Sequence, residues 1–196
     1  MHPMRVLLFS GLILLCCGPA LAQQPGPEFW RKVGCEPFQP RTKLEAIDDR
    51  YSTVIIKAFT RITTVEVRGV RIDAVDMREI GNTVHAKGIV ISLREEGGRL
   101  NDNRAFVDYE EIDALVSAID TIARVDETMT RLPGFEGRYK TLGDLEISVF
   151  RQTRSGAAVS LTTGLCDRAT QTMTLDDLSK VKAMIVEAKT RLDELR

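Results

Sequence analysis

Histidine and cysteine are scarce in this sequence, which has two histidines and four cysteines among its 196 residues. Zinc and non-haem iron sites need at least two or three such ligands at compact spacing, and beyond residue 22 the chain has one histidine, His85, and two distant cysteines, Cys35 and Cys166. A Ser-His-Asp triad would have to use His85, yet the chain lacks the G-x-S-x-G motif, and nothing in the spacing brings Ser92 to this histidine. The sequence therefore predicts no metal site and no catalytic residues.

Glycine-rich phosphate loops and aromatic platforms are also lacking. Neither G-x-x-x-x-G-K nor G-x-G-x-x-G occurs, so we expect no nucleotide cofactor. Aromatic residues make up 6% of the chain, which argues against a sugar-binding platform. The formal net charge of -1 gives no overall attraction to nucleic acid or to an anionic membrane. We therefore expect no cofactor and no nucleic-acid partner.

The first 22 residues are typical of a secretory signal peptide. After Arg5 the chain is mostly apolar as far as Cys17, and Ala20-Leu21-Ala22 forms an A-x-A end. This run is shorter than the roughly 20 residues that a membrane helix needs, although an uncleaved N-terminal anchor is the alternative. We expect cleavage after Ala22 and a secreted or periplasmic protein that has no transmembrane segment after cleavage.

Cleavage would leave two cysteines, Cys35 and Cys166, in an oxidising compartment, where such a pair can form a disulfide. The bridge would close a loop of roughly 130 residues, for which the chain-entropy model gives about 4–5 kcal/mol of stabilisation. The alternative is two unrelated thiols. We expect the Cys35–Cys166 disulfide.

The mature chain is long enough for one domain of ordinary size. Residues 23–50 are expected to form an arm, because prolines at that density block regular helices and strand ladders; they are Pro25, Pro27, Pro37 and Pro40. Two units follow, at residues 51–132 and 133–196, which we expect to form one compact domain.

In the first unit, β-branched residues and alternation of apolar with charged residues indicate strands, clearest at 70–74 and 84–93. We expect these strands to include Val65 and Val67 and a bulge at Val75. A helix follows, with Asp108 as its N-cap and Glu111 completing a capping box. Its apolar stripe is Ile112, Leu115, Val116, Ile119 and Ile122.

The second unit repeats this plan. Strands are expected at 135–142, 145–149 and 157–163, with a short fourth strand at Ala169–Met173 and a final helix capped by Thr174. The apolar stripe of that helix is Leu178, Val181, Ile185, Ala188, Leu192 and Leu195. The two helices match at a shift of 66 residues, which is typical of a duplicated unit; the alternative is that any two amphipathic helices can be slid into register.

The fold class expected is therefore α+β, with two consecutive antiparallel-sheet-plus-C-terminal-helix units whose helices pack on one sheet face. This order of elements, over about residues 51–196, resembles that of the Whirly and PC4-like single-stranded DNA-binding proteins. In Whirly proteins a KGKAAL-type strand carries DNA contacts. Here the corresponding stretch, residues 85–90, keeps one lysine and lacks the motif. The resemblance implies a fold and no binding residues.

Two groups of charged residues are candidates for a site. Basic residues occur along the strands, where they either line one sheet face or form its solvated side; they are Arg68, Arg71, Arg78, Lys87 and Arg94. Carboxylate pairs are also plentiful, among them those at 48–49, 95–96, 110–111 and 176–177. We interpret the last two as first-turn helix residues favoured by the macrodipole.

From these observations we expect a non-catalytic binding or envelope-associated module, whose partner is an unknown protein or a component of the envelope. Its interaction surface would be the sheet face or edge that the two helices leave uncovered. The alternative is a hydrolase that uses carboxylate and arginine chemistry without histidine or metal. A third hypothesis is single-stranded nucleic-acid binding.

Overall fold

The computed structural model describes residues 39–65, 67, 69–94, 104–132, 134–152, 156–164 and 168–195. The expected signal peptide, most of the proline-rich arm, and both Cys35 and Cys166 lie outside these residues.

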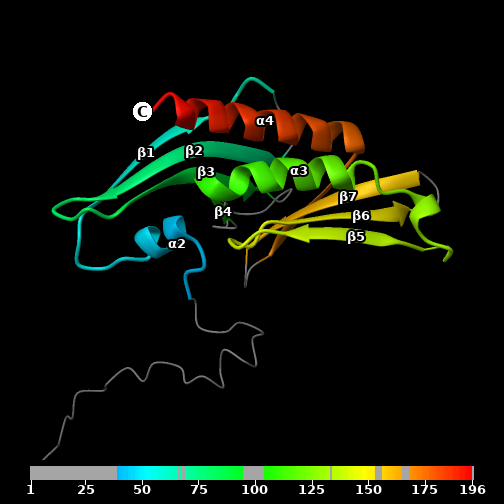
Figure 1. Ribbon diagram of the computed structural model, residues 1–196, viewed down its shortest axis with the longest axis horizontal. Coiled ribbons are helices and arrows are strands. Elements are labelled where there is room, and N and C mark those ends of the chain that lie inside the picture. The colour runs from blue at the N-terminus through cyan, green and yellow to red at the C-terminus, as the bar shows by residue number, and fades with distance from the viewer. Residues whose placement is uncertain are drawn as a thin grey trace, which may run out of the picture. The chain divides into compact units, whose positions relative to one another are not determined.

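Four strands form the first sheet in the order β1-β2-β3-β4, and each strand is antiparallel to its neighbours. They are β1 (Ile55–Arg61), β2 (Val70–Glu79), β3 (His85–Leu93) and β4 (Arg104–Asp108). A short 3-10 helix, η1 (Tyr109–Glu111), leads from β4 into helix α3 (Ile112–Ile122) (Figure 1).

Four further strands form a second antiparallel sheet in the order β5-β6-β7-β8, and a helix again follows. They are β5 (Glu136–Lys140), β6 (Glu146–Gln152), β7 (Gly156–Thr163) and β8 (Ala169–Met173), with η2 (Glu127–Met129) before them and α4 (Leu175–Asp193) after them. The α+β class and the two sheet-plus-helix units are therefore confirmed, as is the short fourth strand.

Two predictions for the strands of the first unit were wrong, and one strand was missed. The expected strand through Val65 and Val67 is not formed, because β1 ends at Arg61 and Val67 makes a single bridge to Val70. The ladder of β2 runs through Val75 without a bulge. Strand β4 was missed, because its three central residues are all buried and show no alternation.

Each unit's helix packs on the other unit's sheet as well as on its neighbouring helix. Helix α4 contacts β2 and β3 of the first sheet, α3 contacts β5 and β6 of the second, and the two helices contact each other. Their buried residues join one hydrophobic core with residues of both sheets; from the helices these are Ile112, Leu115, Ile119, Ile122, Leu178, Val181, Met184, Ile185, Ala188 and Leu192. Leu195, expected in this stripe, lies beyond the end of α4 and is exposed.

A further helix, α2 (Lys43–Asp48), lies within the expected arm and begins after its last proline, Pro40. Its N-terminus carries a capping box in which the Thr42 hydroxyl accepts from the Glu45 N–H (3.1 Å) and the Glu45 carboxylate accepts from the Thr42 N–H (2.9 Å). Leu44 and Ile47 bury its apolar side in a second, smaller core.

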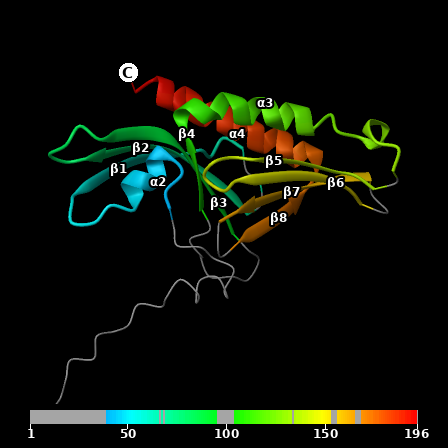
Figure 2. The ribbon, with the colours of Figure 1, turned by 60° about the horizontal axis from the view of Figure 1, so that its bottom comes forward.

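Helices α2 and α4 lie on opposite faces of the first sheet (Figure 1). Along β2, Ile72 and Ala74 join the core beneath α4, whereas Val75 and Met77 join the cluster beneath α2. This is the alternation of a strand covered on both faces. Helix α2 covers only one end of its face, however, and at the other end the described residues line a hollow (Figure 2).

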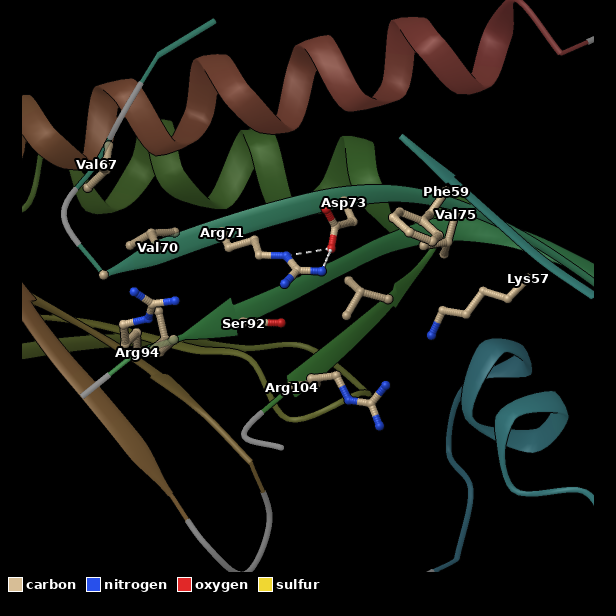
Figure 3. Close-up of a pocket in the computed structure, with 13 residues that line it drawn as sticks. Lys57, Phe59, Val67, Val70, Arg71, Asp73, Val75, Ser92, Arg94 and Arg104 are labelled. Carbon is tan, nitrogen blue, oxygen red and sulfur yellow. Dashed lines mark hydrogen bonds and ion pairs between the residues drawn. The ribbon is translucent and has the colours of Figure 1, made fainter. Parts of the chain in front are cut away.

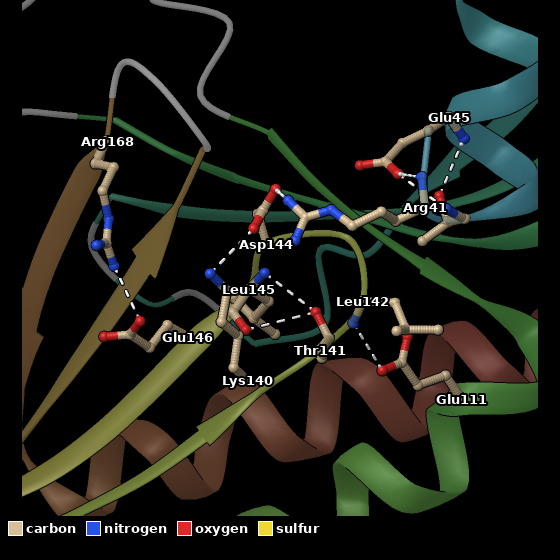
Figure 4. Close-up of polar contacts among 11 residues, drawn as sticks. Arg41, Glu45, Glu111, Lys140, Thr141, Leu142, Asp144, Leu145, Glu146 and Arg168 are labelled. Atoms are coloured by element: carbon tan, nitrogen blue, oxygen red, sulfur yellow. Dashed lines mark hydrogen bonds and ion pairs between the residues drawn. The ribbon is translucent and has the colours of Figure 1, made fainter. Parts of the chain in front are cut away.

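The turn between β5 and β6 joins the two units, and Figure 4 shows its polar contacts. The Phe106 N–H of β4 donates to the Gly143 carbonyl at 3.1 Å. A Cβ on Gly143 would lie 1.9 Å from the Phe106 carbonyl oxygen, so only glycine permits this approach. Asp144, next in the chain, has a positive φ of 63° and places a nearly buried carboxylate against Arg41 and against the Lys140 ammonium, 3.2 Å away.

Candidate functional site

A hollow of about 420 Å³ lies on the part of the first sheet that α2 leaves open (Figure 3). Four of its lining residues are cationic, one is acidic and most of the others are apolar; they are Lys57, Phe59, Val67, Gly69, Val70, Arg71, Asp73, Val75, Val90, Ser92, Leu93, Arg94 and Arg104. A hollow of this size is in the range of small-molecule sites. We call this surface, with Arg61 at its margin, the open face.

Strand register brings Arg71, Ser92 and Arg104 into one row across three neighbouring strands. Arg71 of β2 pairs with Ser92 of β3, and Ser92 pairs with Arg104 of β4. Because neighbouring strands lie about 4.8 Å apart, the two arginines flank the serine closely. Arg94 follows Ser92 by two residues and emerges on the same face. Figure 3 shows the three arginines around Ser92.

Asp73, the acidic residue that lines the hollow, is already neutralised. Its Oδ1 lies 3.2 Å from Arg61 Nε, and its Oδ2 lies 2.6 Å from Arg71 Nη2 and 2.8 Å from Arg71 Nε. The side chain is only 7% exposed, whereas those of Arg61 and Arg71 are about half exposed. Asp73 therefore holds Arg71 in place and leaves one excess positive charge in this group.

A second group of charges lies toward α2. Lys57 Nζ and Arg104 Nη2 are 3.5 Å and 3.7 Å from the carboxylate of Asp48 at the end of α2. Both cations also lie over the Phe106 ring, at 5.7 Å and 5.6 Å from its centroid. Within the described residues no carboxylate lies at ion-pair distance from Arg94. The hollow is thus lined by four cationic side chains and one carboxylate, that of Asp73.

The floor of the hollow is apolar beyond the arginine row. Val90 of β3 and Val75 of β2 are almost fully buried, at 3% and 1% exposure. Phe59 pairs with Val75 across β1 and β2, and its ring is 60% exposed. A ligand on this face would therefore meet the arginine row at one end, and the exposed ring of Phe59 together with Lys57 at the other.

The structure divides the basic residues singled out in the sequence between the two faces. Arg71 and Arg94 lie on the open face, whereas Lys87 lies on the α4 side, where its ammonium donates to the Leu192 carbonyl (3.2 Å) and sits over the Tyr109 ring. Arg78 pairs with Asp76, also away from the open face, and Arg68 lies outside the described residues. Sequence reasoning missed Lys57, Arg61 and Arg104, which period-two alternation combined with the strand register would have placed on the same sheet face as Arg71.

The other candidate residues are engaged elsewhere. His85 bonds to Asp76 at 2.9 Å and lies on the α4 side of β3, so it cannot meet Ser92 on the opposite face. Burial raises the pKa of Asp76, but hydrogen bonds from Arg78 and His85 together with their charges outweigh it and lower the pKa overall. In the part of the chain that the structure describes, no group of three or more histidine, cysteine or acidic side chains could hold a metal ion.

The carboxylate pairs also have structural partners where they are described. Glu110 binds Lys43 (2.6 Å), and this hydrogen bond lowers the pKa of Glu110. Asp177 receives the Lys180 ammonium and the Thr174 hydroxyl in the first turn of α4, where Thr174 is the N-cap as predicted. Asp108 and Glu111 do not form the predicted capping box; both carboxylates bind backbone N–H groups of distant segments.

Comparison with known proteins gives no family for this chain: it matches no protein-family model, and no curated protein shows significant sequence similarity to it. Among the described residues, no helix combines the length and the apolar character needed to cross a membrane.

Proposed function

We propose that this protein is an exported, non-catalytic binding module, and that its site is the open face of the first sheet, where it binds an anionic ligand. The observation that carries the proposal is the gathering of Lys57, Arg71, Arg94 and Arg104 around one hollow. The chain as a whole is slightly acidic, so this concentration of positive charge is a local feature. Export rests on the signal-peptide pattern of residues 1–22.

The charges explain why we favour binding over hydrolysis. A hydrolase without histidine or metal needs a carboxylate that is free to accept or donate a proton. Both oxygens of Asp73 are instead held by Arg61 and Arg71. Arginine side chains stay protonated at all working pH values and recognise carboxylate and phosphate groups through paired N–H donors. The open face is therefore suited to holding an anion.

The proposal is tested by removing the charges in matched sets. One variant replaces Arg71, Arg94 and Arg104 with glutamine; its control replaces Arg124, Arg131 and Arg138, exposed arginines outside the first sheet. Binding of an acidic peptide, a sulfated oligosaccharide and an oligothymidylate is followed by fluorescence anisotropy at low and high salt, because salt screens exposed charges.

We expect at least one probe to bind the unmodified protein and the control alike, and to lose about tenfold or more in affinity with the open-face variant. If every probe binds the two variants equally, or none binds the unmodified protein at low salt, the proposal is wrong. Tight binding of the oligothymidylate alone, dependent on the open face, would identify the anionic ligand as single-stranded nucleic acid.

A further inference from the structure

The arginines of the open face are arranged around a hydroxyl group, and this arrangement suggests which anion they hold. We infer that Arg71, Arg94 and Arg104 with Ser92 form a site for a terminal phosphate group, and that the ligand is a soluble organic phosphate monoester whose apolar body lies toward Phe59. The inference rests on the proposed binding function of this face and narrows it to one chemical class.

The row across the strands sets the shape of the phosphate site. Arg71 and Arg104 are the register partners of Ser92 on its two sides, and Arg94 follows on the same strand. A guanidinium reaches several ångströms beyond its Cα, farther than the roughly 4.8 Å between strands, so all three can point to one group above Ser92. A phosphate monoester offers three terminal oxygens to three guanidinium groups, whereas a phosphodiester offers two.

Two carboxylates prepare the cationic side chains for this role. Asp73 holds Arg71 through Nε and Nη2, so the remaining N–H groups of that guanidinium are available to a ligand. Asp48 lies 3.7 Å from Arg104, a long contact between partly exposed groups. A phosphate group would compete with Asp48 for this guanidinium, because exposed ion pairs of that length contribute little.

The apolar floor argues for an organic ligand over inorganic phosphate. Val90 and Val75 line the path from the arginine row to the exposed ring of Phe59. An apolar or aromatic body of a small molecule would cover this surface and the ring. The volume of about 420 Å³ fits a small molecule.

The experiment measures binding of phenyl phosphate and inorganic phosphate to the full chain by calorimetry at low salt. Arg94→Gln and Ser92→Ala alter the proposed site, Phe59→Ala alters the apolar end, and Arg138→Gln removes the same charge from an exposed position of β5. Asp48→Asn neutralises the carboxylate 3.7 Å from Arg104. Thermal unfolding followed by circular dichroism checks that each variant folds.

We expect Arg94→Gln to weaken phenyl phosphate binding about tenfold and Arg138→Gln to leave it within about twofold. Ser92→Ala should weaken it severalfold, and Asp48→Asn should leave it equal or tighter. Phenyl phosphate should bind more tightly than inorganic phosphate in the unmodified protein, and Phe59→Ala should remove that difference.

Four outcomes would overturn the inference. Equal binding by Arg94→Gln and Arg138→Gln would do so, as would binding to phosphatidic-acid vesicles without binding of phenyl phosphate. If phenyl phosphate does not bind while the acidic peptide binds in an Arg94-dependent manner, the phosphate assignment fails and the proposed function stands. If no anionic probe distinguishes the variant of Arg71, Arg94 and Arg104 from its control, both fail.

Discussion

Asp108 caps a helix to which it does not belong. Its Oδ2 accepts a hydrogen bond from the backbone N–H of Lys43 at 2.8 Å, and its Oδ1 accepts one from Leu44 at 3.1 Å. These N–H groups begin α2, more than sixty residues earlier in the chain, and helix N-termini leave such donors unsatisfied. The carboxylate at the end of β4 thus fastens α2 to the first sheet beside the open face.

Replacing Asp108 with alanine should therefore loosen α2 and not α3. We expect the free energy of unfolding to fall by about 1–2 kcal/mol, with faster amide exchange in residues 43–48. Urea denaturation and hydrogen exchange measure the two effects. Thr174→Ala, which removes the cap of α4, should cost about 1 kcal/mol and leave α2 protected; unchanged exchange in α2 of Asp108→Ala would contradict this role.

Gly88 allows β3 to pass close to β4 and α2. A Cβ at this position would lie 2.2 Å from the Val107 carbonyl oxygen and 2.8 Å from Leu44 Cδ1. Gly88→Ala should lower the free energy of unfolding by about 2–3 kcal/mol, because backbone must move to admit the methyl group. Gly134→Ala, where a Cβ would meet nothing within 4 Å, should be nearly neutral, and equal stabilities of the two variants in urea would refute the explanation.

Glu111 should make the protein less stable as the pH rises from about 4 to 7. Burial raises the pKa of this carboxyl, and the charges of Asp108 and Glu45 add to the effect, while the hydrogen bond from the Leu142 N–H opposes it (Figure 4). A carboxyl whose pKa is higher in the folded than in the unfolded state loses its contribution to stability as the pH passes through the folded-state value.

The matched variant is Glu111→Gln, which keeps an oxygen acceptor for the Leu142 N–H, 3.0 Å from the Glu111 carboxylate. It should equal the unmodified protein in stability at pH 4 and exceed it increasingly toward pH 7, as measured by denaturation at each pH. Other carboxyls titrate in both proteins and cancel in the difference. A difference that is constant with pH would show that the Glu111 pKa is not raised.

Asp144 supports the turn between the two units in two separable ways. Its carboxylate pairs with Arg41 and Lys140, and its backbone has a positive φ of 63°. Asp144→Ala removes the ion pairs and keeps the left-handed backbone, and it should cost about 1.5–3 kcal/mol. Asp144→Gly removes the same ion pairs and also relieves the left-handed strain, so it should be about 1 kcal/mol more stable than Asp144→Ala. Equal unfolding free energies for the two variants would show that the backbone strain contributes nothing.

The cysteine pair and the signal peptide are tested by one measurement on protein recovered after export. We expect the intact mass to correspond to a chain that starts at Gln23, and reduction to add the mass of two hydrogen atoms. Cys35→Ser should abolish that increase and lower the stability by about 4–5 kcal/mol at most. A chain that keeps its initiator methionine, or a mass that reduction does not change, would refute the respective prediction.

A comparison of Thr174 with Asp108 shows which helix caps the sequence alone can predict. Both occupy equivalent positions before an amphipathic helix, and both were predicted to cap it. Thr174 does so, because its partner Asp177 N–H is three residues away and the contact is local. The Asp108 carboxylate could accept hydrogen bonds from the N-terminus of either α3 or α2. The packing of α2 against the first sheet places the N–H groups of α2 at this carboxylate.

Local periodicity was therefore enough to predict the α+β class, the succession of sheet and helix in each unit, and most strand positions, because alternation and helical stripes are properties of short segments. Strand β4 and helix α2 escaped prediction, since a strand buried on both faces shows no alternation and a helix of six residues shows too little of a stripe. Only the tertiary structure placed Arg71, Ser92 and Arg104 in one row. These three residues are neighbours only because of the pairing register of the three strands. A shift of one residue in a strand would have turned its side chain in this row to the opposite face of the sheet.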